Sequence, residues 1–452
     1  MSYDMFKQFD ISDAIEKISK IPFGGYTGNK KKIISEIWHK LDREGIVYDS
    51  VFDAFSGSAV FSLFMKEIGK TVISNDFLTS SYLNALALVE NPGYVLNYNE
   101  MMFVMNNEPD YDVAEGFVYK NYKDIRFTEK ECLDLDRFRI NMSLLDNSYK
   151  TGIGFLNTKT TAVKTPFGMI DRGVDMFKHR IKQMENYGKG SENYDRRIGL
   201  YFDDDMNIDF KQWFAKYNQR FSTAIFQHEE DRIMMGKAFL LRNMESNILT
   251  NCFIGGRYNQ GQVIAKLEHR QQHEKHKGVT DIDFIQTLLK DYVKEGRYNK
   301  LVKEGNKKPC LALNCDIIKL LENTDFVTDI IYLDPPYGGA SSDYAYLYQF
   351  LEEYVYGMKI EELEHIEKYS KRFSNAKTYE ENFLKLLSLL DRFPIWVLSY
   401  NDSSWQSKDY IVNLLKEFRN NIQVFDIDNY IYKYRDDKIT KPGTEYVFLV
   451  TK

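Results

Sequence analysis

Short apolar segments alternate with helical segments near both ends of the chain, and this alternation restricts the possible folds more than any other feature. In residues 48–90 the apolar segments YDSVFDAF and TVISNDF are each followed by a segment of helical character. Residues 310–334 place the helical IIKLLEN between CLALNCD and DIIYLD, and residues 395–452 add IWVLSYN, DYIVNLLKEF, IQVFDID and EYVFLVTK. Strands that alternate with helices are typical of parallel sheets, because a parallel connection must cross the sheet. The sequence therefore predicts an α/β fold with a doubly wound parallel sheet.

Residues 91–307 lack this alternation. They begin with the helix-breaking sequence NPG and contain polar, aromatic-rich helical segments with many Asn, Tyr and Lys residues. The simplest interpretation is one α/β domain, formed by residues 1–90 and 308–452, which is interrupted by a large, mainly helical inserted domain of residues 91–307.

The charge of the chain does not exclude a nucleic-acid partner. The formal net charge is −6, but residues 257–308 contain 12 Lys and Arg against 7 Asp and Glu, a local net charge of 12 − 7 = +5. An acidic protein with a basic face can still bind a polyanion.

Several features indicate a cytoplasmic protein with no membrane partner and no metal. No window approaches ~18 uninterrupted apolar residues, and the first residues lack the basic-then-apolar pattern of a signal peptide. The four cysteines form no CxxC pair, which predicts neither a disulfide framework nor a zinc site. The sequence HRQQHEKH is not an HExxH motif, and we interpret it as a solvated helix face rather than a metal site.

Polar residues follow the first two predicted strands. Asp53 precedes a turn through Gly57, and such a small-residue turn lets a ligand approach backbone N–H groups at a helix N-terminus. Asp76 ends the second strand and is suited either to ribose hydroxyls or to capping the helix that follows. Lys30, in FGGYTGNKKK, is suited to a carboxylate or phosphate, although this segment can equally be a flexible loop with solvated lysines.

The sequence LDPPY ends another predicted strand. The residue before a proline is held extended, and each proline fixes its own φ and lacks an N–H. Asp334, Pro335 and Pro336 therefore predict a rigid corner that offers a carboxylate and a carbonyl but no proline N–H. An exocyclic amine on a nucleobase fits such an acceptor surface, and Tyr337 offers a ring for stacking. The alternative is an ordinary proline-rich turn after a strand.

The segment YAYLYQFLEEYV follows this corner. Tyr344, Tyr348 and Leu351 fall on one helical face. That face could line the mouth of a pocket, but packing in the core is the interpretation we prefer.

Several of these motifs resemble those of a known family. The segments YTGNK, FDAFSGSAVF, SNDF, NCDIIKLL and LDPPY occur in the order seen in the Dam-like DNA adenine methyltransferases. The resemblance covers residues 1–90 and 308–452, about half of the chain, and implies a Rossmann-like, S-adenosylmethionine-dependent methyltransferase sheet. Gly25, where the family often has lysine, and Ser58, where glycine is more usual, depart from the pattern.

The resemblance implies a cofactor-binding role for several residues. Tyr26 and Lys30 would hold the methionine end of S-adenosylmethionine. Asp53 and Gly57 would lie along its backbone, and Asp76 would bind the ribose.

The remaining family positions border the adenine of the cofactor or the target base. Asp316 would reach the adenine ring of the cofactor, and Asp334 would border both the cofactor and the target base. If Asp334 and the Pro335 carbonyl accept both N–H bonds of an adenine amine, its lone pair can attack the methyl group directly. This requires a base swung out of the duplex at a cost of a few kcal/mol. Stacking on Tyr337 would return about 1–3 kcal/mol.

Within residues 91–307, the sequence GGRYNQGQ resembles the RYN segment of the family's DNA-recognition region. We expect Arg257, Tyr258 and Asn259 to contact DNA, since such side chains read base edges and bind phosphates. The predicted function is therefore site-specific methylation of adenine in double-stranded DNA. A cognate restriction endonuclease acting on the same site is a possible partner.

Two alternatives remain. The acceptor corner also suits the exocyclic amine of cytosine, although cytosine enzymes more often carry serine at the position of Asp334. A non-catalytic DNA-binding subunit could retain the same fold, but the intact LDPPY sequence argues against it.

Overall fold

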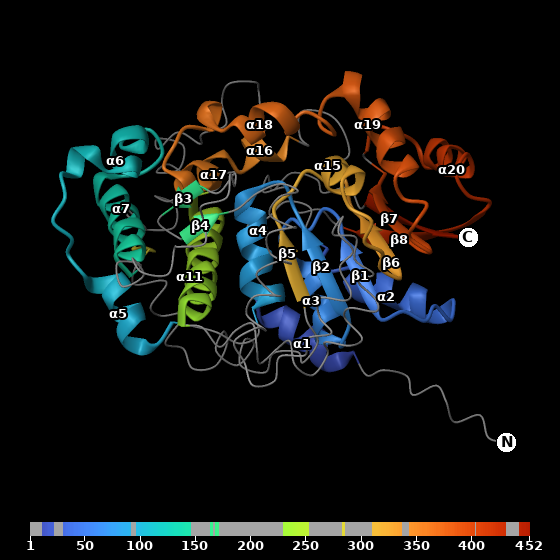
Figure 1. Ribbon diagram of the computed structural model, residues 1–452, viewed down its shortest axis with the longest axis horizontal. Helices are drawn as coiled ribbons and strands as arrows, with labels where there is room; N and C mark the ends of the chain where they lie inside the picture. The colour runs from blue at the N-terminus through green and yellow to red at the C-terminus, as the bar shows by residue number, and fades with distance from the viewer. Residues whose placement is uncertain are drawn as a thin grey trace.

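The computed structural model describes residues 11–21, 30–91, 96–145, 163–165, 168–170, 229–252, 283–284, 310–336, 343–402, 404–430 and 443–452. A seven-stranded mixed sheet lies at the centre of the molecule, with the strand order β5-β2-β1-β6-β7-β9-β8 (Figure 1). The strands are β1 (Ser50–Asp53), β2 (Thr71–Asn75), β5 (Cys310–Leu313), β6 (Ile330–Leu333), β7 (Ile395–Asn401), β8 (Asn421–Tyr430) and β9 (Gly443–Thr451).

The first five strands of this sheet run parallel, as the sequence predicts. Every residue of β1, β2, β5 and β6 is buried, which explains why their sequences are nearly continuous apolar runs without polar alternation. The prediction is wrong for the last two strands, because β9 lies antiparallel between β7 and β8. In the sequence, β9 follows β8 after only twelve residues, and an antiparallel neighbour does not need a crossover helix.

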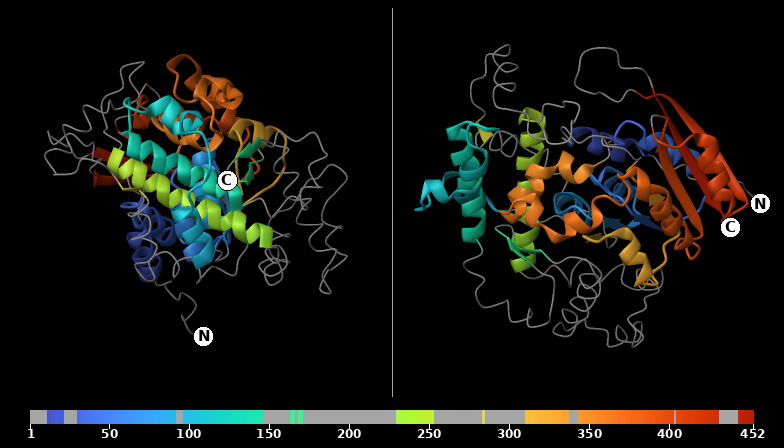
Figure 2. Two further views of the ribbon diagram at one scale, coloured as in Figure 1. Left: turned by 90° about the vertical axis from the view of Figure 1, so that its left-hand side faces the viewer. Right: turned by 90° about the horizontal axis from the view of Figure 1, so that it is seen from above.

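Helices from residues 1–90 and 308–452 surround the sheet (Figures 1 and 2). They are α1 (Ser12–Lys20), α2 (Ile34–Arg43), α3 (Val60–Glu67), α4 (Thr79–Ala85), α15 (Ile317–Glu322), α19 (Ala376–Ser388) and α20 (Lys408–Lys416). The helix α4 continues as the π-helical turn η1 (Leu86–Glu90) and ends where the sequence NPG begins.

A second group of helices covers the upper edge of the sheet in Figure 1. It consists of α16 (Tyr344–Leu347), α17 (Gln349–Tyr356), the 3-10 turn η7 (Ile360–Glu362) and α18 (Glu364–Tyr369). Tyr348 separates α16 from α17, and both Tyr348 and Leu351 are buried in the core, as the preferred interpretation of this segment predicts.

The described part of residues 91–307 is mainly helical. It contains α5 (Tyr98–Asn106), η2 (Val113–Glu115), α6 (Phe117–Tyr122), α7 (Glu129–Leu144), α11 (Glu229–Cys252) and a small antiparallel pair, β3 (Val163–Thr165) and β4 (Gly168–Ile170). The long helix α11 packs against α4 and η1, while α5, α6 and α7 form the end of the molecule opposite β8 and β9 (Figures 1 and 2). The helix α11 packs directly on the α/β core, so its position does not mark where an inserted domain begins or ends. The boundaries of that domain stay a prediction. Among the described helices, none is both long enough and apolar enough to cross a membrane.

Candidate active site

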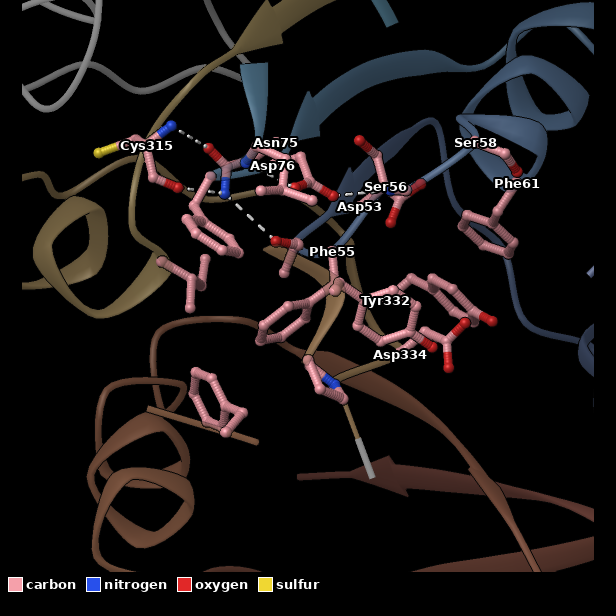
Figure 3. Close-up of a pocket in the computed structure, with 18 of the residues that line it drawn as sticks. Asp53, Phe55, Ser56, Ser58, Phe61, Asn75, Asp76, Cys315, Tyr332 and Asp334 are labelled. Carbon is pink, nitrogen blue, oxygen red and sulfur yellow. Dashed lines mark hydrogen bonds between the residues drawn. The ribbon is translucent and has the colours of Figure 1, made fainter. Parts of the chain in front are cut away.

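A pocket lies at the carboxyl ends of β1, β2, β5 and β6 (Figure 3). The chain places β2 and β5 on one side of β1 and β6 and β7 on the other, so the strand order reverses beside β1. In open α/β sheets, ligands bind beyond the strand ends at such a reversal. The helices α16 and α18 contribute Tyr344 and Tyr369 to the opposite wall.

The end of β1 brings two buried polar atoms to the pocket without hydrogen-bond partners among the described residues. Asp53 is almost fully buried, and its Oδ2 accepts a hydrogen bond from Ser62 Oγ at 2.7 Å, whereas its Oδ1 has no such bond. The hydroxyl oxygen of Ser56 is also buried and has no hydrogen-bond partner among the described residues. The pKa of Asp53 is raised to about 7, mainly by burial; the hydrogen bond from Ser62 opposes this rise, and the nearby Asp334 and Asp76 carboxylates add to it. The site can therefore satisfy a ligand that carries hydrogen-bond donors.

Asp76 connects the turn after β1 to the start of α4. Its Oδ2 accepts a hydrogen bond from the N–H of Gly57 at 2.8 Å, and its Oδ1 accepts one from the N–H of Leu78 at 2.9 Å. Gly57 has φ = 51°, a left-handed conformation that favours glycine. Burial raises the pKa of Asp76 to about 6, although these backbone bonds oppose the shift. Asp76 thus holds the chain just before α4, but the N-cap of that helix is Leu78, which has no side-chain cap, so the capping alternative is wrong. Asp76 lines the pocket, and its binding to a ribose stays a prediction.

Asn75 and Asp316 fix the far end of the pocket. The amide of Asn75 donates to the carbonyl oxygens of Ala54 and Cys315 at 3.2 and 3.0 Å, which ties the ends of β1, β2 and β5 together (Figure 3). Asp316 caps α15 by accepting the N–H of Lys319 at 3.0 Å. Burial raises the pKa of Asp316, and Arg372, whose Nε lies 3.4 Å from the carboxylate, opposes this rise.

Asp334 lies at the other end of the pocket, beside Tyr332 (Figure 3). Its side chain is 19% exposed, and its Oδ1 lies 3.2 Å from Lys30 Nζ. Lys30 itself is 3% exposed and forms a second ion pair, at 2.7 Å, with Glu445 on β9. The alternative of a solvated lysine is therefore wrong for Lys30. Tyr332 stacks face to face on Phe61, with ring centroids 3.7 Å apart, and this packing supports the strand that carries Asp334.

Comparison with known proteins identifies the family. The family model described as D12 class N6 adenine-specific DNA methyltransferase matches residues 26–209. The Type II methyltransferase M2.HphI of Haemophilus parahaemolyticus is 25% identical over 432 residues, which cover 95% of this chain and 98% of that protein. The family model and this relative together support an adenine N6 DNA methyltransferase family for the chain. This confirms the family that the motifs predict and favours adenine over the alternative of cytosine. No solved structure matches the chain.

The fold of this methyltransferase gathers most of the predicted site residues around one pocket. Those that line it are Lys30, Asp53, Gly57, Asp76, Asp316, Asp334 and Pro336. Pro335 is buried next to them. The other predicted residues, Tyr26, Tyr337, Arg257, Tyr258 and Asn259, lie outside the described residues.

Sequence reasoning missed several residues of the methyltransferase pocket. Phe373 and Tyr369 line it, and Phe373 packs edge to face on Phe55 with centroids 5.4 Å apart. Tyr344 also lines it, so for this residue the less preferred of the two interpretations fits, in contrast to its buried neighbours Tyr348 and Leu351. Glu445 has one signal in the sequence, a carboxylate at the beginning of an otherwise apolar strand, but nothing local connects it to the site.

Proposed function

We propose that this enzyme transfers a methyl group from S-adenosylmethionine to the exocyclic amino group of an adenine swung out of double-stranded DNA at a specific sequence. The observation that carries the proposal is the position of Asp334. Its carboxylate borders the same pocket as Asp53 Oδ1 and Ser56 Oγ, which have no hydrogen-bond partner in the part of the chain that the structure describes. One pocket can therefore hold a small donor-rich ligand beside an acceptor for an amine.

The residues that line the pocket suit S-adenosylmethionine. Asp53 Oδ1 and Ser56 Oγ, which accept no hydrogen bond from any described residue, suit the amine or hydroxyl donors of such a molecule. Asp76 and Asp316 also line the pocket and could accept further bonds. Lys30, together with Tyr26, would hold the methionine carboxylate. When bound, this cofactor supplies a methyl group made electrophilic by a sulfonium centre.

Asp334 and the proline corner would activate the adenine. The amino lone pair is delocalised into the ring, so the nitrogen is a poor nucleophile until its two N–H groups are held out of the ring plane. The Asp334 carboxylate and the Pro335 carbonyl would accept these two bonds and stabilise the positive charge that develops on nitrogen. Stacking on Tyr337 would offset part of the cost of removing the base from the duplex.

We assign recognition of the DNA sequence to residues 91–307, inserted into a doubly wound methyltransferase sheet. Arg257, Tyr258 and Asn259 are the proposed DNA contacts in this region. The relative from Haemophilus parahaemolyticus is named a Type II methyltransferase. We accordingly place this enzyme in a restriction–modification context in the cytoplasm, where a cognate endonuclease would act on the same site.

Transfer of a tritiated methyl group from S-adenosylmethionine to duplex DNA tests the proposal. We expect label in N6-methyladenine after digestion. Asp334→Asn should lower kcat by roughly 10²–10³-fold, because it removes a charged acceptor, while S-adenosylmethionine binding measured by calorimetry is retained. Glu381→Gln, an exposed acid-to-amide change on α19, is the matched control and should keep full activity. Label in N4-methylcytosine, or a fully active Asp334→Asn enzyme, would refute the proposal.

A further inference from the structure

The carboxylate of Glu445 is buried beside the pocket, outside the residues that line it. Its exposed fraction is 0%. Oε1 accepts hydrogen bonds from Lys30 Nζ at 2.7 Å and from Ser399 Oγ at 2.5 Å, and Oε2 accepts one from Asn401 Nδ2 at 3.4 Å. A fully buried carboxylate is costly unless it is paired and hydrogen-bonded. Partners from two further segments of the chain therefore fix the position of this carboxylate.

The register of the sheet explains why Glu445 reaches the active site. Leu333 of β6 lies opposite Leu398 of β7, so Asp334 follows at the level of Ser399. On the other side of β7, the antiparallel strand β9 places Glu445 opposite Asn401. The ends of β6 and β7 and the beginning of β9 therefore meet at the edge of the sheet that carries the pocket.

Lys30 joins Glu445 to Asp334. Its ammonium lies 2.7 Å from Glu445 Oε1 and 3.2 Å from Asp334 Oδ1, so one cation contacts two carboxylates. A lysine ammonium is a point charge on a flexible four-carbon stem, and its direction must be set by its partners. Asp334 is partly exposed at 19%, whereas Glu445 is fully buried and held by three donors. Glu445 is therefore the fixed end of this chain of contacts.

We infer that Glu445 is a positioning residue for methyl transfer, which acts by holding the Lys30 ammonium against Oδ1 of Asp334. The Lys30 contact would fix the orientation of the Asp334 carboxylate, which is the proposed acceptor for a hydrogen bond from the target amine. The inference rests on the proposed function, because it assigns Glu445 a part in the same reaction.

A double-mutant cycle tests this role. The kcat for methyl transfer, at saturating DNA and S-adenosylmethionine, is measured for wild type, E445Q, K30M and K30M/E445Q. We expect E445Q to lower kcat about tenfold or more in the wild-type background, and less than about twofold in the K30M background, where its target is absent. A purely structural role of Glu445, through Ser399 and Asn401, would give the same loss in both backgrounds.

Thermal unfolding of the same four proteins gives a second readout. K30M leaves a buried carboxylate without its cation and should lower Tm, whereas K30M/E445Q removes both charges and should recover most of that loss. The kinetic assays are run at a temperature at which all four proteins are folded. Glu90→Gln is the matched control, since Glu90 is also buried and accepts a hydrogen bond from the backbone N–H of Ala312. We expect this variant to leave kcat unchanged.

The possible failures are distinguishable. An active wild-type enzyme with equal losses from E445Q in both backgrounds, or with no loss at all, overturns the positioning role alone. A wild-type enzyme that transfers no methyl group to DNA overturns the proposed function and this inference together.

Discussion

The buried carboxyl group of Asp53 should make the stability of this protein depend on pH in an unusual direction. Its pKa is about 7 in the folded protein, against 3.8 as the ordinary value, and burial is the main cause. The folded state therefore binds a proton more tightly than the unfolded chain. The free energy of unfolding should rise as the pH falls through 7 and should reach its full gain below about 4. Most paired carboxylates have the opposite effect, because their pKa values are lowered by folding.

The magnitude follows from the size of the shift. Each pKa unit corresponds to about 1.36 kcal/mol. Between about pH 8.5 and about pH 5, two units below the folded pKa, Asp53 alone should add about 2.7 kcal/mol to the free energy of unfolding. Asp76, whose pKa is raised to about 6, acts in the same direction, so the wild-type profile alone does not isolate Asp53.

The variant Asp53→Asn isolates the contribution of Asp53, because asparagine has the same shape and does not titrate. Urea unfolding, followed by circular dichroism, gives the free energy of unfolding of both proteins at the two pH values. We expect the stability of Asp53→Asn relative to wild type to be greater at the higher pH by about 2.7 kcal/mol. Glu381→Gln, exposed on α19, should show no such difference. If the relative stability of Asp53→Asn is the same at both pH values, the assignment of a raised pKa to Asp53 is wrong.

Two further predictions concern ligands. If Asp53 must be ionised to bind a cationic donor of S-adenosylmethionine, the Kd measured by calorimetry should weaken about tenfold from about pH 8 to about pH 6, one unit below its pKa. A Kd that is constant over this range would contradict that role. Alanine at Arg257, Tyr258 and Asn259 should abolish site-specific methylation and leave S-adenosylmethionine binding intact. Loss of cofactor binding as well would show that these three residues are structural.

The sequence alone predicts much of the methyltransferase core. The apolar runs of β1, β2, β5 and β6 are visible locally, because a strand buried on both faces has no polar alternation. Acidic residues at the ends of these strands share one pocket, since the carboxyl ends of parallel strands meet at the same edge of a sheet. Asp53, Asp76 and Asp334 were predictable for this reason, whereas Asp316 was predicted through the family resemblance.

Contacts that depend on the order and direction of strands were not predictable in this way. The direction of β9 depends on which neighbour it pairs with, and its apolar pattern is the same in either direction. The pairing of Arg372 with Asp316 depends on how α18 and α19 pack above the strand ends. No local pattern encodes such a packing.

Lys30 and Glu445 show this division most clearly. Both residue types are visible in the sequence, and a resemblance already places Lys30 near a cofactor. They are 415 positions apart, however, and they meet because β9 inserts between β7 and β8 and brings its first residues to the edge where β6 ends. The sequence determines which segments become strands and which side chains stand at their ends. The tertiary structure alone decides that a buried carboxylate from the last strand holds the lysine beside Asp334, because strand order is a property of the whole sheet.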